Sequence, residues 1–261
     1  RIVWSSPMFD GSPASWKHGI PLASPEQARV MVDSMQRLGF DFIKVYVRLQ
    51  RDVYFAIAEQ AKLRGMPFAG HLPGRIELTE ALRAGQRSLE HSDGIALACT
   101  PGASALLDSV FATDDRAERE VRGRRFAQRM LEAFDPDECG EVLRTLAASG
   151  TWIVPTVAVV GGHAFVRDTA MLRDRRLEFV PPALARRWLS DAEEDAAEDP
   201  PEELAFDEEM FRRGMRLVGA MHVAGVSILA GTDASDEPFV YAGSSLHDEL
   251  ELLVEGGLTP F

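Results

Sequence analysis

The sequence lacks the features that mark membrane and nucleic-acid-binding proteins. Its 261 residues contain no run of about eighteen apolar residues, so no helix is expected to span a membrane. Its 41 acidic side chains outnumber its 28 basic ones, and the net charge of −13 argues against a nucleic-acid partner, because phosphate binding requires clustered Lys and Arg. The two cysteines, Cys99 and Cys139, form no CxxC or metal-ligand spacing, and a disulfide between them is left open.

A repeated unit runs along the chain, in which a helical pattern ends in Gly and a short apolar run follows. The unit occurs five times, as MQRLGFDFIKVYV, AKLRGMPFAGHL, ALRAGQRSLEH, LAASGTWIVPT and MHVAGVSILAGTD. Each Gly stands where a helix end adopts the left-handed conformation, which Gly accepts without steric cost. Short runs of Ile, Val, Phe and Leu are typical of fully buried strands. With RIVWS at the start, the chain has about six predicted strands.

Strands that alternate with helices predict an α/β fold with parallel pairing, either a (β/α)8 TIM-like barrel or a doubly wound sheet. No GxGxxG follows any of the strands, which weakens the dinucleotide-binding version. We expect residues 1–261 to form a single barrel domain with two inserted helical or loop regions, 92–149 and 157–203. The second insertion ends in SDAEEDAAEDPPEE, interpreted as a solvated linker or mobile loop.

Polar side chains stand at the carboxyl ends of several predicted strands. His71 ends PFAGH, His91 ends RSLEH, and Asp233 ends VSILAGTD. Lys44 lies inside the apolar FIKVYV, where a charge is costly unless it is paired or neutralised. The carboxyl ends of barrel strands form the face where active sites are built. We therefore predict that Lys44, His71, His91 and Asp233 form a metal site, although each residue alone also has an ordinary structural explanation.

Imidazole and carboxylate groups suit zinc, and a zinc-bound water with a pKa near 7 can attack a carbonyl carbon. The sequence thus predicts a metal centre that suits zinc, and a small-molecule substrate. Three further residues are candidates for contacts with that substrate. Tyr46 follows Lys44 by two positions and so shares its strand face, His163 follows the strand in TWIVPT, and His247 opens the helix after the last strand.

The ordered segments DFIKVY, AGHLPG, SLEH, AGTDAS and LHDELELLVEGGLTP resemble the amidohydrolase superfamily, in particular its prolidase-like and imidazolonepropionase-like metal-dependent hydrolases. The resemblance implies a distorted (β/α)8 barrel with one or two divalent metal ions, usually zinc, that cleaves amide-like C–N bonds of small molecules, such as dipeptides or cyclic amides. It also implies that Lys44 is carboxylated and bridges two metals, and that His71 and His91 bind the second metal. Asp233 would bind the first metal and act as general base.

The sequence departs from that family in one respect, because the family's His-x-His pair at the end of its first strand is absent. We therefore expect a barrel that lacks its first strands, a chain incomplete at both ends, and a segment that can be inactive alone. Two rival interpretations stay open, an esterase or lactonase on the same scaffold and a non-catalytic barrel without metals. The sequence assigns no cellular compartment, and a homo-oligomer is left open.

Overall fold

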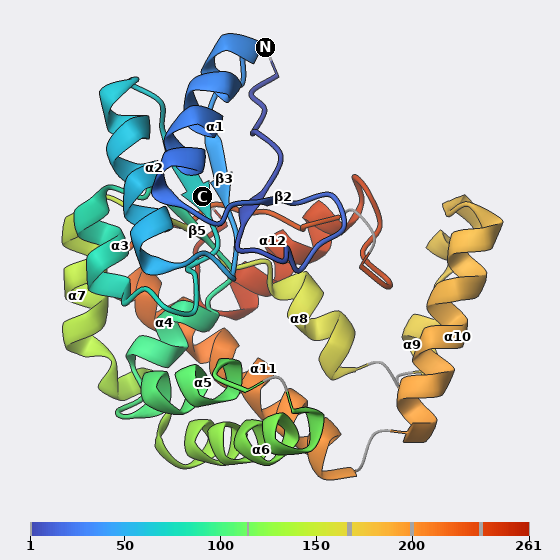
Figure 1. The fold of residues 1–261 in the computed structure, drawn as a ribbon. Helices are drawn as coiled ribbons and strands as arrows, with labels where there is room; N and C mark the ends of the chain where they lie inside the picture. The colour runs from blue at the N-terminus through green and yellow to red at the C-terminus, as the bar shows by residue number, and fades with distance from the viewer. Residues whose placement is uncertain (1, 114, 166–168, 199–200, 235–236, 261) are drawn as a thin grey trace.

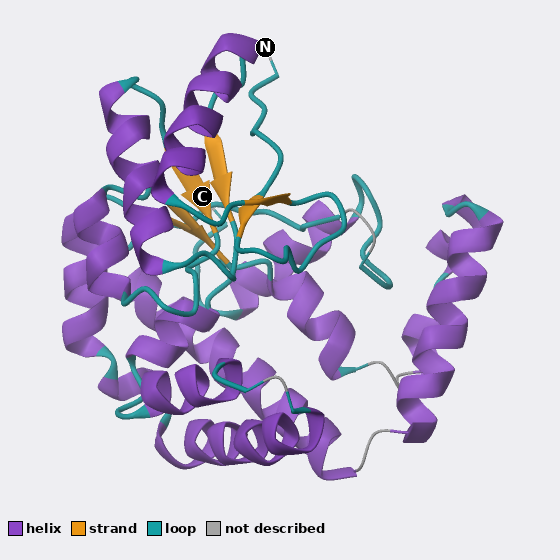
Figure 2. Ribbon diagram, in the orientation of Figure 1, coloured by secondary structure: helices purple, strands orange, loops and turns teal. Residues whose placement is uncertain are grey.

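The computed structural model describes residues 2–113, 115–165, 169–198, 201–234 and 237–260. A sheet of six short strands lies at its centre, with helices packed around it (Figures 1 and 2). The strands are β1 (Phe9–Asp10), β2 (Ile20–Pro21), β3 (Ile43–Val45), β4 (Phe68–Gly70), β5 (Ser88–Glu90) and β6 (Trp152–Val154). Their order in the sheet is β2-β1-β3-β4-β5-β6, and each neighbouring pair is parallel. The predicted α/β class is confirmed.

The two ends of the sheet differ from the prediction. The described part of RIVWS, residues 2–5, forms no strand and contributes one bridge between Ser5 and Phe42, so the first strand along the described chain is β1. VSILAG runs along β6 through a bridge of Ile228 with Ile153, where Leu229 N donates to Ile153 O at 2.8 Å. In the part of the chain that the structure describes, the sheet is open, with β2 at one end and this segment at the other. Closure into a (β/α)8 barrel stays a prediction.

The helices follow the predicted rhythm of helix, Gly and strand. They are α1 (Pro25–Leu38), α2 (Arg51–Leu63), α3 (Leu78–Ala84), α4 (Asp93–Ala98), α5 (Ala103–Phe111), α6 (Arg116–Ala133), η1 (Pro136–Glu138), α7 (Gly140–Ser149), α8 (Val157–Ala164), α9 (Thr169–Leu172), η2 (Arg175–Phe179), α10 (Pro182–Glu198), α11 (Pro201–Val223) and α12 (Ser245–Glu255). Helix α1 begins at Ser24, whose side chain accepts from Gln27 N, and ends at Gly39 with φ of 85°. All five glycines of the repeat have positive φ, which confirms the predicted helix ends. No described helix is long and apolar enough to cross a bilayer.

Two apolar clusters hold the sheet to its helices. One joins β1, β3 and β4 to α1 and α2, with Phe9, Ile43 and Ile57 fully buried. The other surrounds β5 and β6 and includes Ile153 and residues of α7 and α11. Leu72, directly after His71, packs against both clusters. The apolar contacts therefore fix the position of the chain at the end of β4.

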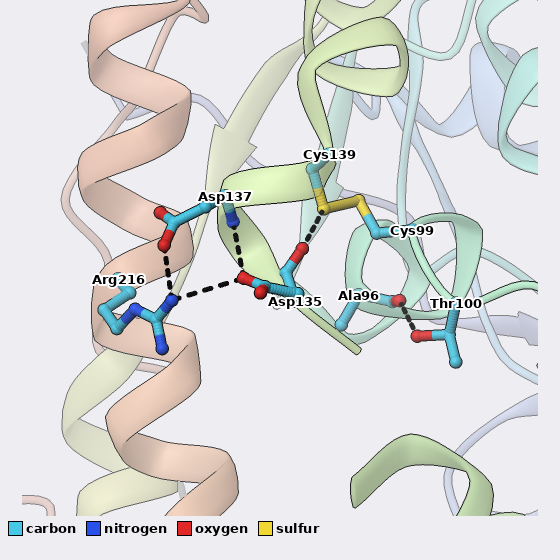
Figure 3. Close-up of a disulfide and its surroundings, with 7 residues drawn as sticks. All are labelled: Ala96, Cys99, Thr100, Asp135, Asp137, Cys139 and Arg216. Carbon is cyan, nitrogen blue, oxygen red and sulfur yellow. Dashed lines mark hydrogen bonds and ion pairs between the residues drawn. A yellow bond between two sulfur atoms is a disulfide. The ribbon is translucent and has the colours of Figure 1, made fainter. Parts of the chain in front are cut away.

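The first predicted insertion, 92–149, folds into α4 to α7 and is closed by a disulfide between Cys99 and Cys139 (Figure 3). The two Cα atoms are 5.2 Å apart, and the cysteines are separated by 40 positions in the sequence. Arg216 of α11 pairs with Asp135 at 3.2 Å and with Asp137 at 2.6 Å, beside the disulfide. The disulfide that the sequence left open is thus present.

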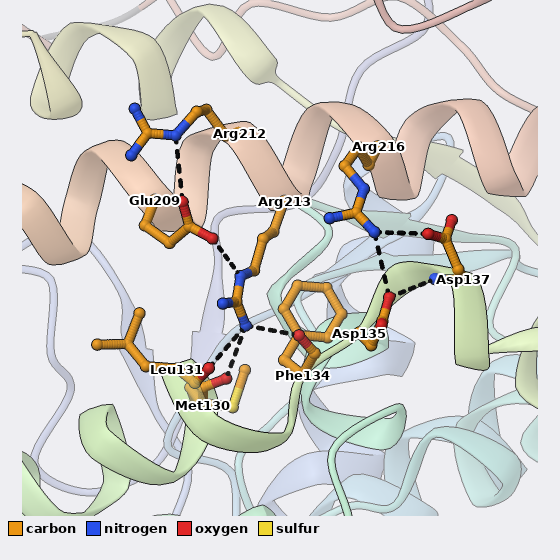
Figure 4. Close-up of polar contacts among 9 residues, drawn as sticks. All are labelled: Met130, Leu131, Phe134, Asp135, Asp137, Glu209, Arg212, Arg213 and Arg216. Atoms are coloured by element: carbon orange, nitrogen blue, oxygen red, sulfur yellow. Dashed lines mark hydrogen bonds and ion pairs between the residues drawn. The ribbon is translucent and has the colours of Figure 1, made fainter.

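Arg213 of α11 holds the carboxyl end of α6 in place (Figure 4). Its Nη1 donates to the carbonyl oxygens of Leu131 at 2.9 Å and Phe134 at 2.7 Å, and its Nε pairs with Glu209 at 2.7 Å. A cation suits the last carbonyls of a helix, which have no partner within the helix. These contacts fasten the first insertion to α11, the helix that leads into the segment ending at Asp233.

The second predicted insertion, 157–203, contains α8, α9, η2 and α10. The acidic run was expected to be a linker or loop, but the structure places its first part in α10, which extends to Glu198. The expectation was wrong there because Ala and Glu favour helix, and because Ala192 gives the helix a buried position beside Trp188.

Removal of the disulfide is expected to destabilise the protein. The bond closes a loop of about 40 residues in the unfolded chain, and the loss of this restraint in a Cys99→Ser, Cys139→Ser variant is expected to lower the free energy of unfolding by about 4 kcal/mol. Urea unfolding followed by circular dichroism measures this, with reduced wild-type protein as the matched control. Equal midpoints for oxidised wild type and variant would contradict the role given to the bond.

Candidate active site

The pairing of β3, β4 and β5 brings polar side chains into two rows. Val45, Gly70 and Leu89 lie level with one another, so the next positions, Tyr46, His71 and Glu90, form a row at the strand ends. Lys44 lies level with Ala69, two positions before Tyr46 on β3, so its side chain is on the same face of the sheet as that of Tyr46. The sheet therefore presents a cation, an imidazole and a carboxylate together at its carboxyl edge.

Lys44 is neutralised by Glu90, a residue that sequence reasoning did not single out. Lys44 Nζ lies 2.8 Å from Glu90 Oε2, and the two side chains are only 20% and 21% exposed. The pair offsets the free-energy cost that the sequence predicted for burying the Lys44 charge, because a buried charge is tolerated when it is paired. The signal for Glu90 was its position in RSLEH, a carboxylate inside an apolar strand and directly before His91.

His71 carries a buried ring nitrogen without a hydrogen-bond partner. A β-carbon at Gly70 would collide with Val45 O, so Gly at this position lets β4 approach β3 closely just before His71. His71 Nδ1 has no hydrogen-bond partner among the described residues, and the nearest carboxylate atom, Glu90 Oε2, is 3.6 Å away. Burial, together with the nearby His91 and Lys44, lowers the pKa of His71 to about 3. The ring is therefore neutral near pH 7, with a lone pair available.

His91 is oriented by Thr156 and faces Asp233. Thr156 Oγ1 donates its one proton to Pro155 O at 2.8 Å, and it lies 2.6 Å from His91 Nδ1. The hydrogen-bond network therefore assigns the proton to His91 Nδ1 and the lone pair to Nε2. That Nε2 points at Asp233 Oδ2 at 3.8 Å. A lone pair and a carboxylate facing each other require a cation or a proton between them.

The backbone is strained at the same three positions. Residues other than glycine rarely adopt the left-handed conformation, yet His91, Thr156 and Asp233 have φ of 64°, 50° and 50°. Each such residue costs about 1–3 kcal/mol and persists only where the surroundings impose it. Strain gathered at residues that also contact one another points to a functional site.

Glu249 of α12 binds the start of α8, next to Thr156, and the sequence analysis did not identify it. It is fully buried, and its Oε2 accepts from Ala158 N at 2.8 Å at the start of α8, two residues after Thr156. Burial raises the pKa of Glu249, while the N–H groups of residues 156–158 oppose the rise. The signal was the spacing of Ser245, Glu249 and Leu253, which are all buried on one face of α12.

The predicted substrate contacts have different outcomes. The Tyr46 ring lies 4.4 Å from the His71 ring, and burial and the charges of Asp10 and Asp233 raise its pKa, so its hydroxyl stays protonated. His247 is exposed on α12, and the structure shows no contact between it and the site in the described part of the chain. The side chain of His163 lies outside the described residues. Substrate binding by all three stays a prediction.

The donor atoms at this site fit a divalent cation. A continuous series of contacts runs from Lys44 through Glu90, His71 and His91 to Asp233, with the two imidazole rings 4.6 Å apart. Within the described ranges, no three His, Cys, Asp or Glu side chains are gathered tightly enough to define a metal site outright. The unpartnered Nδ1 of His71 and the Nε2 of His91 are nevertheless the nitrogen donors that zinc prefers.

Comparison with known proteins supports the predicted superfamily through one solved structure. No family model and no curated protein matches the sequence. Among solved structures, bottromycin amidohydrolase aligns with a TM-score of 0.71 and 27% identity, over 97% of this chain and 50% of that one. A. niger ochratoxinase aligns with a TM-score of 0.51 and 18% identity, over 98% of this chain and 44% of that one.

A further amidohydrolase structure aligns with a TM-score of 0.51 and 19% identity, over 93% of this chain and 44% of its own. The chain therefore spans about half the length of the solved structures it matches. The likeness to bottromycin amidohydrolase supports the amidohydrolase superfamily, which the ordered segments of the sequence predicted.

The raised pKa of Glu249 predicts a pH-dependent effect on stability. A carboxyl whose pKa is higher in the folded state contributes stability below its unfolded pKa and loses that contribution as the pH rises through the folded value. Wild type should therefore lose stability relative to Glu249→Gln over the pH range above about 4, the ordinary pKa of a Glu carboxyl. Urea unfolding across this range measures the difference, with exposed Glu251→Gln on the same helix as the control. A constant difference between wild type and Glu249→Gln would contradict the assignment.

Proposed function

We propose that this chain carries a metal-binding and catalytic part of a hydrolase that cleaves amide-like C–N bonds of small molecules, such as dipeptides or cyclic amides. One observation supports the proposal most directly. His91 Nε2 faces Asp233 Oδ2, and the neighbouring His71 has an Nδ1 without a hydrogen-bond partner among the described residues. The likeness to bottromycin amidohydrolase supports the same reaction class.

In this proposal, His71 Nδ1, His91 Nε2 and Asp233 hold a divalent metal. Zinc in such a place supplies a Lewis acid and lowers the pKa of a bound water to about 7. Thr156 fixes the His91 ring, because its oxygen accepts from Nδ1 and so keeps Nε2 free as a ligand. The Lys44–Glu90 pair removes a net charge that would otherwise repel the metal from the strand ends.

Asp233 is the proposed general base. Its side chain is 40% exposed, so it reaches solvent and substrate while lying beside His91. Asp233 takes a proton from the attacking water as the new C–O bond forms, and then delivers it to the leaving nitrogen as the C–N bond breaks. Tyr46, protonated and adjacent to His71, donates a hydrogen bond to the substrate carbonyl oxygen.

Carboxylation of Lys44 belongs to this proposal as a separate prediction. The ammonium of Lys44 already has Glu90 as counter-ion at 2.8 Å, so a carboxylated lysine would place two anions side by side. Carboxylation would therefore require either a second metal between the two groups or a reorientation of Glu90.

Zinc binding is expected to depend on the two histidines. His71→Ala and His91→Ala each remove a ligand and should abolish measurable binding, whereas Thr156→Val, which leaves the ligands intact but releases the His91 ring, should weaken binding about tenfold. Isothermal titration of zinc into the metal-free chain measures this. His222→Ala is the matched control, because His222 is exposed at the end of α11. Equal zinc affinity for wild type and His91→Ala would refute the proposed site.

Hydrolysis is expected to require Asp233 and to act on amides. With zinc bound, Asp233→Asn should lower kcat by about 10²–10⁴-fold on a dipeptide, because the variant keeps the shape of the side chain and loses the base. The assay is run on this chain and on any longer protein that contains it, with a matched ester as second substrate. A clear preference for the ester would favour the esterase or lactonase alternative. Zinc binding without turnover of either substrate would favour the non-catalytic one.

A further inference from the structure

We infer that a cavity beside the candidate active site binds an apolar side chain of an uncharged amide substrate. This inference rests on the proposed function and names the class of substrate. The cavity of about 420 Å³ lies between the amino-terminal half of α10 and the segment around residues 240–244. A volume of about 300–1,000 Å³ is usual for small-molecule pockets.

The walls of this side-chain cavity are apolar and packed. Leu184 and Trp188 of α10 form one side, and Val240 and Tyr241 form the other. Trp188 is 3% exposed, and its ring packs edge to face on Tyr241 at 5.9 Å. A rigid aromatic wall of this kind gains free energy from any apolar group that it covers, without having to be ordered by the ligand.

Tyr241 lines the cavity and carries a buried hydroxyl group. It is 5% exposed, and its hydroxyl has no hydrogen-bond partner among the residues that the structure describes. A buried hydroxyl left without a partner is unfavourable, so a ligand atom that completes the bond is expected. Burial and the nearby Asp174 raise the pKa of Tyr241 to about 12, so the hydroxyl is a neutral donor. A carbonyl oxygen of the ligand is the matching acceptor.

The charges near the cavity are already paired, which argues for an uncharged ligand. Arg176 stacks over the Tyr241 ring at 4.4 Å, and its guanidinium binds Asp174 at 2.7 Å and Asp248 at 2.5 Å. A ligand carboxylate would have to compete with both acids for Arg176. A ligand ammonium would have to displace Arg176 from the carboxylates of Asp174 and Asp248.

The backbone connects this cavity to the candidate active site. Ala234 lines the cavity and directly follows Asp233, the proposed base. Phe239, directly before the lining residue Val240, is 6% exposed, packs 6.1 Å from Trp188 and has a left-handed φ of 61°, which a bulky residue rarely adopts. A side chain held in the cavity would therefore place its own amide next to Asp233.

The experiment measures equilibrium binding of two probes to the Asp233→Asn variant, which is expected to hydrolyse them about 10²–10⁴-fold more slowly than wild type. The probes are N-acetyl-L-phenylalaninamide and N-acetylglycinamide, which differ only in the side chain. Calorimetry is expected to show the phenylalanine probe binding about tenfold more tightly. Ala242→Phe, added to fill the cavity from an exposed wall position, should abolish that difference, whereas Ala148→Phe on the exposed face of α7 should preserve it.

Adding Tyr241→Phe should weaken the phenylalanine probe about fivefold, because the carbonyl loses its donor while the ring remains. Equal affinities for the two probes, a preference that survives Ala242→Phe, or no loss on Tyr241→Phe would overturn the inference. Its failure is distinguishable from that of the proposed function. If binding depends on the side chain but the wild-type chain hydrolyses no amide, the cavity inference stands and the proposed hydrolase function is refuted. If the wild-type chain hydrolyses amides but binding does not depend on the side chain, the proposed function stands and the cavity inference is refuted.

Discussion

The register between three short strands determines where the polar groups of this protein lie. Because Val45, Gly70 and Leu89 are level, the residues that follow them emerge in one row, and Lys44 comes up beneath that row. A shift of β5 by one position would turn Glu90 away and leave Lys44 without its counter-ion. The close approach of β3 and β4 at Gly70 fixes this register, because no other residue fits against the Val45 carbonyl.

Several polar groups at and near the strand ends are held by a partner from another element. Lys44 of β3 is paired with Glu90 of β5, His91 is bound by Thr156 at the start of α8, and Glu249 of α12 lies against the first N–H groups of α8. His71 instead stays neutral through burial. The site is therefore an assembly of several elements, and its geometry depends on the packing of α8 and α12 as much as on the strands.

The sequence predicted the parts of this fold that are encoded locally. A helix end at Gly followed by an apolar run is a short-range pattern, and four of the five runs are strands. The two-residue strands β1 and β2 were missed because they contain Asp10 and Pro21 and form no apolar run. The pairing of Cys99 with Cys139 depends on how α4 to α7 fold back, which no local pattern encodes. Glu90 had a local signal in RSLEH, but its partner Lys44 and the contact of Thr156 with His91 become visible only in the folded structure. The structure brings Lys44, His71, His91 and Asp233 into one series of contacts, while their roles as ligands and base stay predictions.

The left-handed backbone conformation at His91 and Asp233 lowers the stability of the folded protein at two positions whose side chains are proposed to act in catalysis. Glycine adopts that conformation freely, so replacing either residue with glycine would relieve strain while deleting a side chain proposed to do the chemistry. Laboratory selection for heat resistance alone would therefore favour variants without these groups. Thermal tolerance and reactivity must be selected together if both are to be kept.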